Sequence, residues 1–153
     1  MVLYGWYMIE AGITRIDNFT LIDRMLEKAP GPVDLTIGSF AVVEGWLKRM
    51  FRLKDSGKVR DLELVLPSSI LTRHREMIFL LEEICDGVYL TETHAKFVYL
   101  STPPPTDFQL VTIMSANATA NYRVESYVTT DDKAIVNKIK QDIKAIKDAA
   151  IKL

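Results

Sequence analysis

Two short segments rich in Val, Leu and Ile, each followed by a helical pattern, most constrain how this chain can fold. Val33–Phe40 and Leu62–Leu66 predict buried strands, because short segments rich in β-branched and aliphatic residues that end beside glycine or proline suit strands covered on both faces. The segments that follow, from about Val42 to Leu53 and from about Ser69 to Ile84, repeat apolar residues at helical spacing. Parallel strands need such a crossover helix, so we expect these two strands to be parallel. The alternation predicts an α/β fold.

The rest of the chain adds short strands and two more helices. A helix is predicted from Asp17 or Asn18 to about Lys28, and a last helix from the cap at 130–132 to about Ile151. This last helix carries one apolar stripe, made of Ile135, Ile139, Ile143 and Ile146. The further predicted strands are Val2–Ile9, Gly87–Thr91, Ala95–Leu100, Leu110–Met114 and Val124–Thr129. Their close spacing allows antiparallel pairs, and we expect residues 1–153 to form a single domain.

Composition limits the classes of function. The chain has 153 residues and 48% hydrophobic content, enough for a real core. Its net charge is −1, so binding to phosphate requires a local patch rather than bulk charge. The apolar N-terminus lacks the basic region of a secretory signal, and no apolar run approaches the ~20 residues that span a membrane. The single cysteine, Cys85, predicts a buried thiol in a reducing compartment. We therefore expect a cytoplasmic protein without membrane insertion.

Five polar residues lie on or beside three of the predicted strands. His94 and Lys96 are two residues apart, and so are Ser115 and Asn117, while Glu125 lies in a later apolar run. Residues i and i+2 of a strand point to the same face, so each pair is expected to project together. An imidazole, an ammonium, a hydroxyl, an amide and a carboxylate can then converge, and that set suits a phosphate.

Each of these residues has a predicted role. His94 titrates near pH ~6.5 when unperturbed, so it can act as nucleophile in one step and proton carrier in another. Lys96 is the counter-charge for the phosphate, and Ser115 and Asn117 are neutral donors to its oxygens. Glu125 would accept a hydrogen bond from His94 and fix its tautomer. Each residue also has a non-functional interpretation. His94 can bond locally and Lys96 can be a solvated strand lysine. The Ser115 and Asn117 pair can form a turn at a strand end, and Glu125 can be an exposed carboxylate. The shared phasing favours function for His94, while the two interpretations of Glu125 stay open.

Two further observations bear on chemistry. The sequence shows no cluster of His, Cys, Asp or Glu at metal-ligand spacing and no glycine-rich phosphate loop. A mechanism without metal or cofactor is therefore expected. The other histidine, His74, lies between Arg73 and Arg75 at a predicted helix start, where we favour a solvated helix turn over a functional patch.

The pattern resembles the phospholipase D superfamily, also called the HKD family, whose signature is His-x-Lys-x4-Asp-x6-Gly-Ser-x-Asn. His94-Ala95-Lys96 matches its first part and Ser115-Ala116-Asn117 its last part, and Glu125 looks like its downstream acidic position. Ser101 stands where the family has Asp, and Met114 where it has Gly, so the motif is degenerate. The gap between the half-motifs is also longer and holds three prolines. The resemblance implies a phospholipase D-like mixed β-sheet flanked by helices on both faces.

The resemblance also implies a partner. Family enzymes bring two His-x-Lys motifs to one active site, and this chain carries one copy. A second copy would place the site on a two-fold axis, as in the small single-motif bacterial endonucleases of the superfamily. We therefore favour a homodimeric phosphodiesterase, most simply a metal-independent nuclease. The alternative is an impaired module that binds nucleic acid or phosphate without turnover, because Met114 can crowd the phosphate and the motif Asp is missing. The substrate, whether DNA, RNA, phospholipid or another phosphodiester, does not follow from the sequence.

Overall fold

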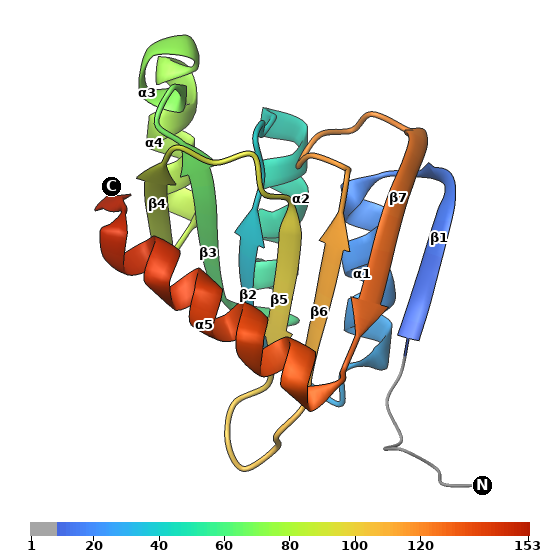
Figure 1. The fold of residues 1–153 in the computed structure, drawn as a ribbon. Coiled ribbons are helices and arrows are strands. Elements are labelled where there is room, and N and C mark those ends of the chain that lie inside the picture. Colours follow the sequence, from blue (N-terminus) through green and yellow to red (C-terminus); the bar gives the residue numbers. More distant parts are fainter. Residues whose placement is uncertain (1–8) are drawn as a thin grey trace, which may run out of the picture.

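A computed structural model describes residues 9–153, which form one mixed sheet with helices on both faces (Figure 1). The strands are β1 (Ile9–Ile16), β2 (Val33–Gly38), β3 (Val59–Pro67), β4 (Gly87–Thr91), β5 (Phe97–Ser101), β6 (Gln109–Met114), β7 (Arg123–Thr130) and β8 (Ile151–Lys152). The helices are α1 (Asn18–Lys28), α2 (Glu44–Asp55), α3 (Ile70–Arg73), α4 (Arg75–Ile84) and α5 (Lys133–Ala149). The predicted fold class, a phospholipase D-like mixed sheet flanked by helices, is confirmed.

Three neighbouring strands of the sheet run parallel, and the pairs on both sides of them are antiparallel. Its strand order is β1-β7-β6-β5-β2-β3-β4-β8. The strands β2 and β3 run parallel, as the crossover argument predicted, and β4 also runs parallel to β3. Antiparallel pairs join β2 to β5, β5 to β6, β6 to β7 and β7 to β1. The two parts meet where β2 pairs with β5, so strand ends from distant parts of the sequence lie at one edge of the sheet.

Three elements differ from the sequence prediction. The strand β1 was not predicted, and the predicted strand Val2–Ile9 lies outside the described residues except for Ile9. The single helix predicted over 69–84 is two helices, because the backbone of His74 has φ −138° and leaves the helical region. The last helix ends at Ala149, and the chain continues as β8 against β4.

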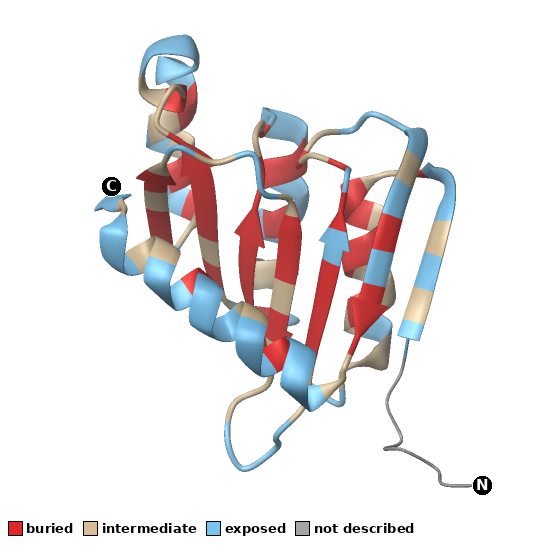
Figure 2. Ribbon diagram, viewed as in Figure 1, coloured by how far each residue is buried: buried red, intermediate tan, exposed pale blue. Residues whose placement is uncertain are grey.

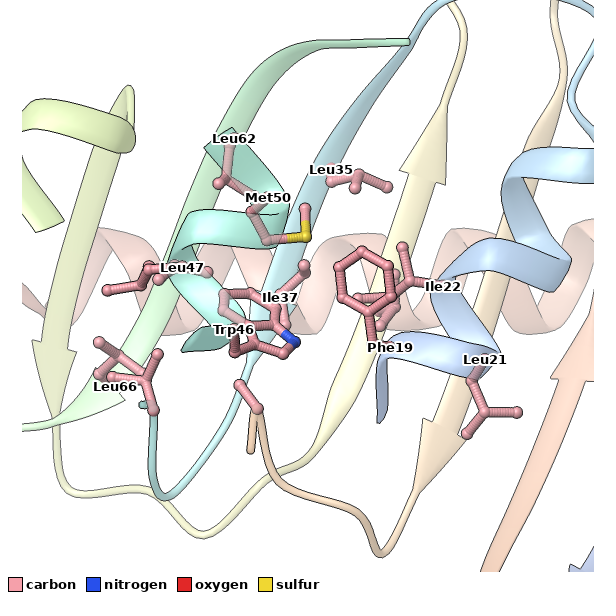
Figure 3. Close-up of a cluster of buried hydrophobic side chains, with 14 of the residues drawn as sticks. Phe19, Leu21, Ile22, Leu35, Ile37, Trp46, Leu47, Met50, Leu62 and Leu66 are labelled. Atoms are coloured by element: carbon pink, nitrogen blue, oxygen red, sulfur yellow. The ribbon is translucent and has the colours of Figure 1, made fainter. Parts of the chain in front are cut away.

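The main core lies between the sheet and α1, α2 and α4, which cover its back face in the view of Figure 1. Trp46, Leu47 and Met50 of α2 share one helix face and pack near Ile37 of β2 (Figure 3). Fully burying a side chain of this kind contributes roughly 1.5–3 kcal/mol. Burial is concentrated in the central strands and in the inner faces of the helices (Figure 2). No helix within residues 9–153 is long and apolar enough to cross a bilayer.

The helix α5 crosses the front of the sheet and closes a second, smaller cluster (Figure 1). Ile143 of the predicted stripe packs there with Val65 and Phe97, whereas Ile135 at the start of the helix is exposed. A side chain on Gly38 would have its Cβ 2.2 Å from the Phe97 ring. Only glycine therefore lets β2 end beside Phe97, which places the two strands close together at the sheet edge.

One buried polar side chain joins the layers of the main core. Asn18, at the start of α1, is fully buried, and its Oδ1 accepts a hydrogen bond from Trp46 Nε1 at 2.9 Å. Its Nδ2 lies 3.4 Å from the Met114 sulfur at the end of β6. Asn18 thereby links α1, α2 and β6, and satisfies an indole N–H that burial would otherwise leave unpaired.

We expect Asn18→Ala to destabilise the fold by about 1–3 kcal/mol, because the buried Trp46 N–H loses its acceptor. Urea unfolding followed by tryptophan fluorescence measures the change. Asn137→Ala, on the exposed face of α5, is the matched control and should shift stability by no more than about 0.5 kcal/mol. Equal stability of the two variants would contradict this role of Asn18.

Candidate active site

Three strands have an end at the same edge of the sheet, meaning the edge formed by the ends of the strands, at the top of Figure 1. There β2 ends at Gly38, β5 begins at Phe97 beside it, and β6 ends at Met114. The segment that carries His94 enters β5 at this edge, and the segment that carries Ser115 and Asn117 leaves β6 there. The two halves of the motif, about twenty residues apart in sequence, are therefore neighbours because β5 and β6 form an antiparallel pair.

A buried hydroxyl joins the end of β2 to the segment after β6. Ser39 Oγ accepts a hydrogen bond from the backbone N–H of Ala118 at 2.8 Å and donates to the carbonyl oxygen of Ala41 at 2.5 Å. The backbone N–H of Val43 donates to the carbonyl oxygen of Ala118 at 3.2 Å. These bonds fix the loop that follows β2 against the Ser-x-Asn segment.

The orientation of the Asn117 amide follows from this junction. Its Oδ1 accepts a hydrogen bond from the backbone N–H of Phe40 at 3.0 Å and lies 3.3 Å from Ser39 Oγ. A backbone N–H can only donate, so the oxygen of the amide must face Phe40. The Nδ2 group has no hydrogen-bond partner among the described residues. Asn117 therefore presents a donor with its acceptor already engaged, as the predicted contact to a phosphate oxygen requires.

His94 and Lys96 lie in the loop between β4 and β5, not in a strand as the i, i+2 argument assumed. The exposed imidazole of His94 stacks on the Phe40 ring, with centroids 4.4 Å apart and planes 12° from parallel. Lys96 Nζ donates to the carbonyl oxygen of His94 at 3.1 Å, and the Lys96 carbonyl accepts from the Met114 N–H at 3.1 Å. The pair is positioned by the start of the β5–β6 ladder and by a ring contact.

Ser115 and Glu125 contact each other across the ends of β6 and β7. The Ser115 hydroxyl donates to the Glu125 carboxylate and accepts from the backbone N–H of Ser126 at 3.0 Å. The predicted partner of Glu125 was His94, but in the structure the carboxylate holds Ser115. Because a serine has one proton to donate, Ser115 can donate to a phosphate only after it leaves Glu125. The roles predicted for both residues stay predictions.

The side chains of the two positions that depart from the family motif do not enter the site. Met114 ends β6 at this edge, but it is buried and its sulfur faces Asn18 in the main core, so its side chain does not crowd the site. Ser101 ends β5, four residues from Phe97 and hence roughly 13 Å along the strand. Asp107, the next acidic residue along the chain, lies in the proline-containing loop after Ser101, beyond the end of β5 that is opposite His94.

Sequence reasoning missed two residues that build the site. Ser39 and Phe40 belong to neither half of the motif, yet one anchors the Ser-x-Asn segment and the other touches both halves. A signal was available in Gly38-Ser39 at the end of the predicted strand, because a glycine there allows a close approach of the backbone, although it does not name the partner.

Other reactive groups contribute little to this site. Within residues 9–153, no three ligand-type side chains are close enough to hold a metal ion. Burial raises the pKa of the Cys85 thiol to about 12, so it stays protonated at neutral pH and is a poor nucleophile. Arg73 and His74 line a small cavity together with Phe40, but in the described part of the chain no hydrogen bond joins them to His94, Lys96 or Asn117.

The strand order, the helices on both faces and the site at the central strand ends define a phospholipase D-like fold. Among solved structures, the chain is similar to NucT from Helicobacter pylori, with a TM-score of 0.73 and 12% identity over 97% of this chain and 100% of that one. It is also similar to Nuc from Salmonella typhimurium, a phospholipase D family member, with a TM-score of 0.66 and 11% identity over 97% and 99%.

A third similar structure is that of a longer protein. The chain matches TrmBL2, an archaeal chromatin protein with a novel mode of DNA binding, with a TM-score of 0.58 and 16% identity over 97% of this chain and 55% of that one. No protein-family model and no curated protein matches the sequence. At these identities the likeness establishes the fold, and function rests on the residues of the site.

We expect Ser39→Ala to destabilise the protein by about 1–3 kcal/mol, because the buried Ala118 N–H loses its acceptor. Urea unfolding measures this change. Ser56→Ala, at the exposed end of α2, removes a hydroxyl of the same size and should have a smaller effect. A Ser39→Ala protein as stable as the control would show that this junction does not hold the loop.

Proposed function

We propose that this protein is a phosphodiesterase of phospholipase D-like type, and specifically a metal-independent nuclease. In this proposal His94 acts on phosphorus, Lys96, Ser115 and Asn117 bind the phosphate, and the site is shared by two copies of the chain. The observation that carries the proposal is the meeting of the loop before β5 and the loop after β6 at the end of β2. Phe40 contacts both loops, so the His94 imidazole and the Asn117 amide are both next to this one residue.

The first chemical step is transfer of the phosphoryl group to histidine. A ring nitrogen of His94 attacks phosphorus and forms a P–N bond, and the P–O bond to the leaving group breaks. His94 of the partner subunit gives its proton to the leaving oxygen. Lys96 and Asn117 stabilise the negative charge on the remaining phosphate oxygens, which is the largest contribution available without a metal.

The second step restores the enzyme. His94 of the partner subunit, now neutral, takes a proton from water as the water oxygen attacks phosphorus. The P–N bond breaks and the phosphate leaves with the new oxygen. One imidazole serves as nucleophile and the other as acid and then base, so two histidines suffice and neither needs a cofactor.

The need for a second copy has a structural counterpart. The helix α5 covers the front of the central strands and of the first part of β6, while the front of the end of β6 and of β7 and β1 is uncovered (Figure 1). This uncovered face carries the exposed apolar residues Ile13, Ile113, Val124 and Val128. Their strand partners place them on the same side of the sheet as Phe97. The face is hollowed by about 540 Å³, and Ser115 lies at its margin, next to the candidate site.

The substrate class is proposed from the similarity to other proteins and not from the geometry of the site. The resemblance to small single-motif endonucleases favours a nucleic acid, and the DNA-binding description of TrmBL2 agrees with that choice. The alternative function, a module that binds nucleic acid or phosphate without turnover, is favoured by two observations. The Ser115 proton is engaged by Glu125, and Ser101 replaces the motif Asp, so two polar groups of the active motif are not available.

We expect His94→Asn to reduce cleavage of bis-p-nitrophenyl phosphate, and of a DNA oligonucleotide, to background. Each shared site loses its nucleophile and its acid together, and acid–base catalysis alone contributes roughly 10²–10⁴-fold. Release of p-nitrophenol with EDTA present throughout measures the effect. Folding should survive, because the side chain is exposed.

His74→Asn is the matched control, since it changes the other histidine, which is exposed between α3 and α4. It should cleave like wild type. Cleavage that needs added magnesium, or that persists unchanged in His94→Asn, would overturn the mechanism. A wild type that binds phosphate or DNA but cleaves no phosphodiester would support the binding module instead.

We expect a dimer at micromolar concentration, and we expect Ile13→Lys to dissociate it. Ile13 is 79% exposed on the uncovered face, and an ammonium buried there without a partner would oppose association. Sedimentation equilibrium measures the mass, and cleavage should fall together with the dimer fraction. Phe79→Lys, 75% exposed on α4 at the back of the sheet, is the control and should stay dimeric. A folded monomer with full activity would exclude a shared site.

A further inference from the structure

Phe40 contacts both halves of the motif while belonging to neither. Its backbone N–H donates to Asn117 Oδ1 at 3.0 Å, and its ring stacks on the His94 imidazole at 4.4 Å. The residue follows Gly38-Ser39, where the Ser39 junction fixes the path of the backbone. The ring of Phe40 and its backbone N–H therefore set the relative position of the Asn117 amide and the His94 imidazole.

The geometry of the stack has a chemical consequence. The two ring planes are 12° from parallel, so Phe40 holds the imidazole by its face. The nitrogens of an imidazole lie in the ring plane, and within the described residues neither nitrogen of His94 makes a hydrogen bond. A carboxylate that orients a histidine occupies one of these nitrogens. An aromatic face restricts the plane of the ring and leaves both nitrogens open.

The Phe40 ring also borders the scaffold. It is half-buried, and it lines a small cavity of about 130 Å³ together with the apolar side chains of Val42, Pro67 and Ile70 and with Arg73 and His74. These neighbours come from the segment after β2, from the end of β3, from α3 and from the break that follows α3. The residue that carries the ring thus belongs to the scaffold and not to the loop that carries His94, as a platform for the imidazole requires.

We propose that Phe40 is the positioning residue of this site, which holds His94 by face-to-face stacking in place of a hydrogen-bonded carboxylate. Both nitrogens of His94 then stay available to a phosphate group, one for attack and the other for proton exchange. The inference rests on the proposed function for its catalytic meaning. Its geometric content, an imidazole held by an aromatic face with open nitrogens, can be tested in a protein without activity.

The structural test uses the imidazole C–H signals of the protein in solution. The sequence has only two histidines, so His74→Asn assigns the remaining set to His94. Stacking on Phe40 should shift the His94 signals upfield, because they lie above an aromatic ring. Phe40→Leu keeps an apolar side chain and the backbone N–H, and should abolish the shift, while Phe40→Tyr should retain it. The same His94 shifts in wild type and Phe40→Leu would overturn the proposal.

The functional test separates positioning from folding. Phe40→Leu should lower kcat on bis-p-nitrophenyl phosphate by roughly 10- to 100-fold with little change in KM, because the phosphate ligands remain while the nucleophile loses its orientation. Phe40→Tyr should recover most of the rate. Phe51→Leu, on the exposed side of α2, is the matched control and should be unchanged. A Phe40→Leu enzyme with wild-type kcat would overturn the positioning role.

The positioning role of Phe40 can also be tested if the protein proves not to be a phosphodiesterase. If the wild type cleaves no phosphodiester, inorganic phosphate is titrated while the His94 signals are followed. Phe40→Leu should then weaken phosphate binding several-fold, and Phe40→Tyr should not. Loss of affinity in Phe40→Leu alone supports positioning of His94 in a binding module, and equal affinities in all three proteins overturn the inference.

Discussion

The site depends on the buried Ser39 hydroxyl, which ties the end of β2 to the segment after β6. In the sheet these two strands are separated by β5, so strand pairing alone does not join them. The hydroxyl accepts the Ala118 N–H, and a further backbone bond from Val43 to Ala118 closes the junction. Because the loop is fixed here, the N–H of Phe40 meets the Asn117 amide and its ring meets His94. Removing one hydrogen bond at Ser39 would loosen contacts of both half-motifs.

Most of the fold was predictable from patterns that burial imposes. Central strands are covered on both faces, so β2 and the middle of β3 are short and rich in Val, Leu and Ile, and α2 shows its buried stripe of Trp46, Leu47 and Met50. The edge strand β1 was not predicted, because most of its side chains are exposed or half-buried and mix glycine and charge with isoleucine. The break at His74 was missed because a single departure from helical backbone leaves the apolar spacing of its neighbours intact.

For the candidate site, the meeting of its segments was more predictable than their contacts. Residue types and their order indicated His94, Lys96, Ser115 and Asn117, and these segments do meet at one sheet edge. The i, i+2 rule assumed a strand at His94, whereas strand pairing starts only at Phe97. The contact of Ser115 with Glu125 depends on how the β6–β7 ladder ends, and the stack on Phe40 joins residues 54 positions apart. Such contacts between distant residues leave no periodic signal in one sequence, so only the folded chain could reveal them.

The active-site motif and the helical cover on the front of the sheet are both incomplete, and the two lie next to each other. The motif supplies one histidine where the proposed chemistry uses two, and α5 covers only part of the front of the sheet, leaving the apolar face of Ile13, Ile113, Val124 and Val128 exposed. Ser115 lies at the boundary of both. A second copy seated on that face would remove apolar surface from water and bring a second imidazole toward the first, so one association would serve stability and chemistry together. Because Phe40 leaves both nitrogens of His94 open, the imidazole needs no rearrangement of partners within its own chain to meet a phosphate held between two subunits.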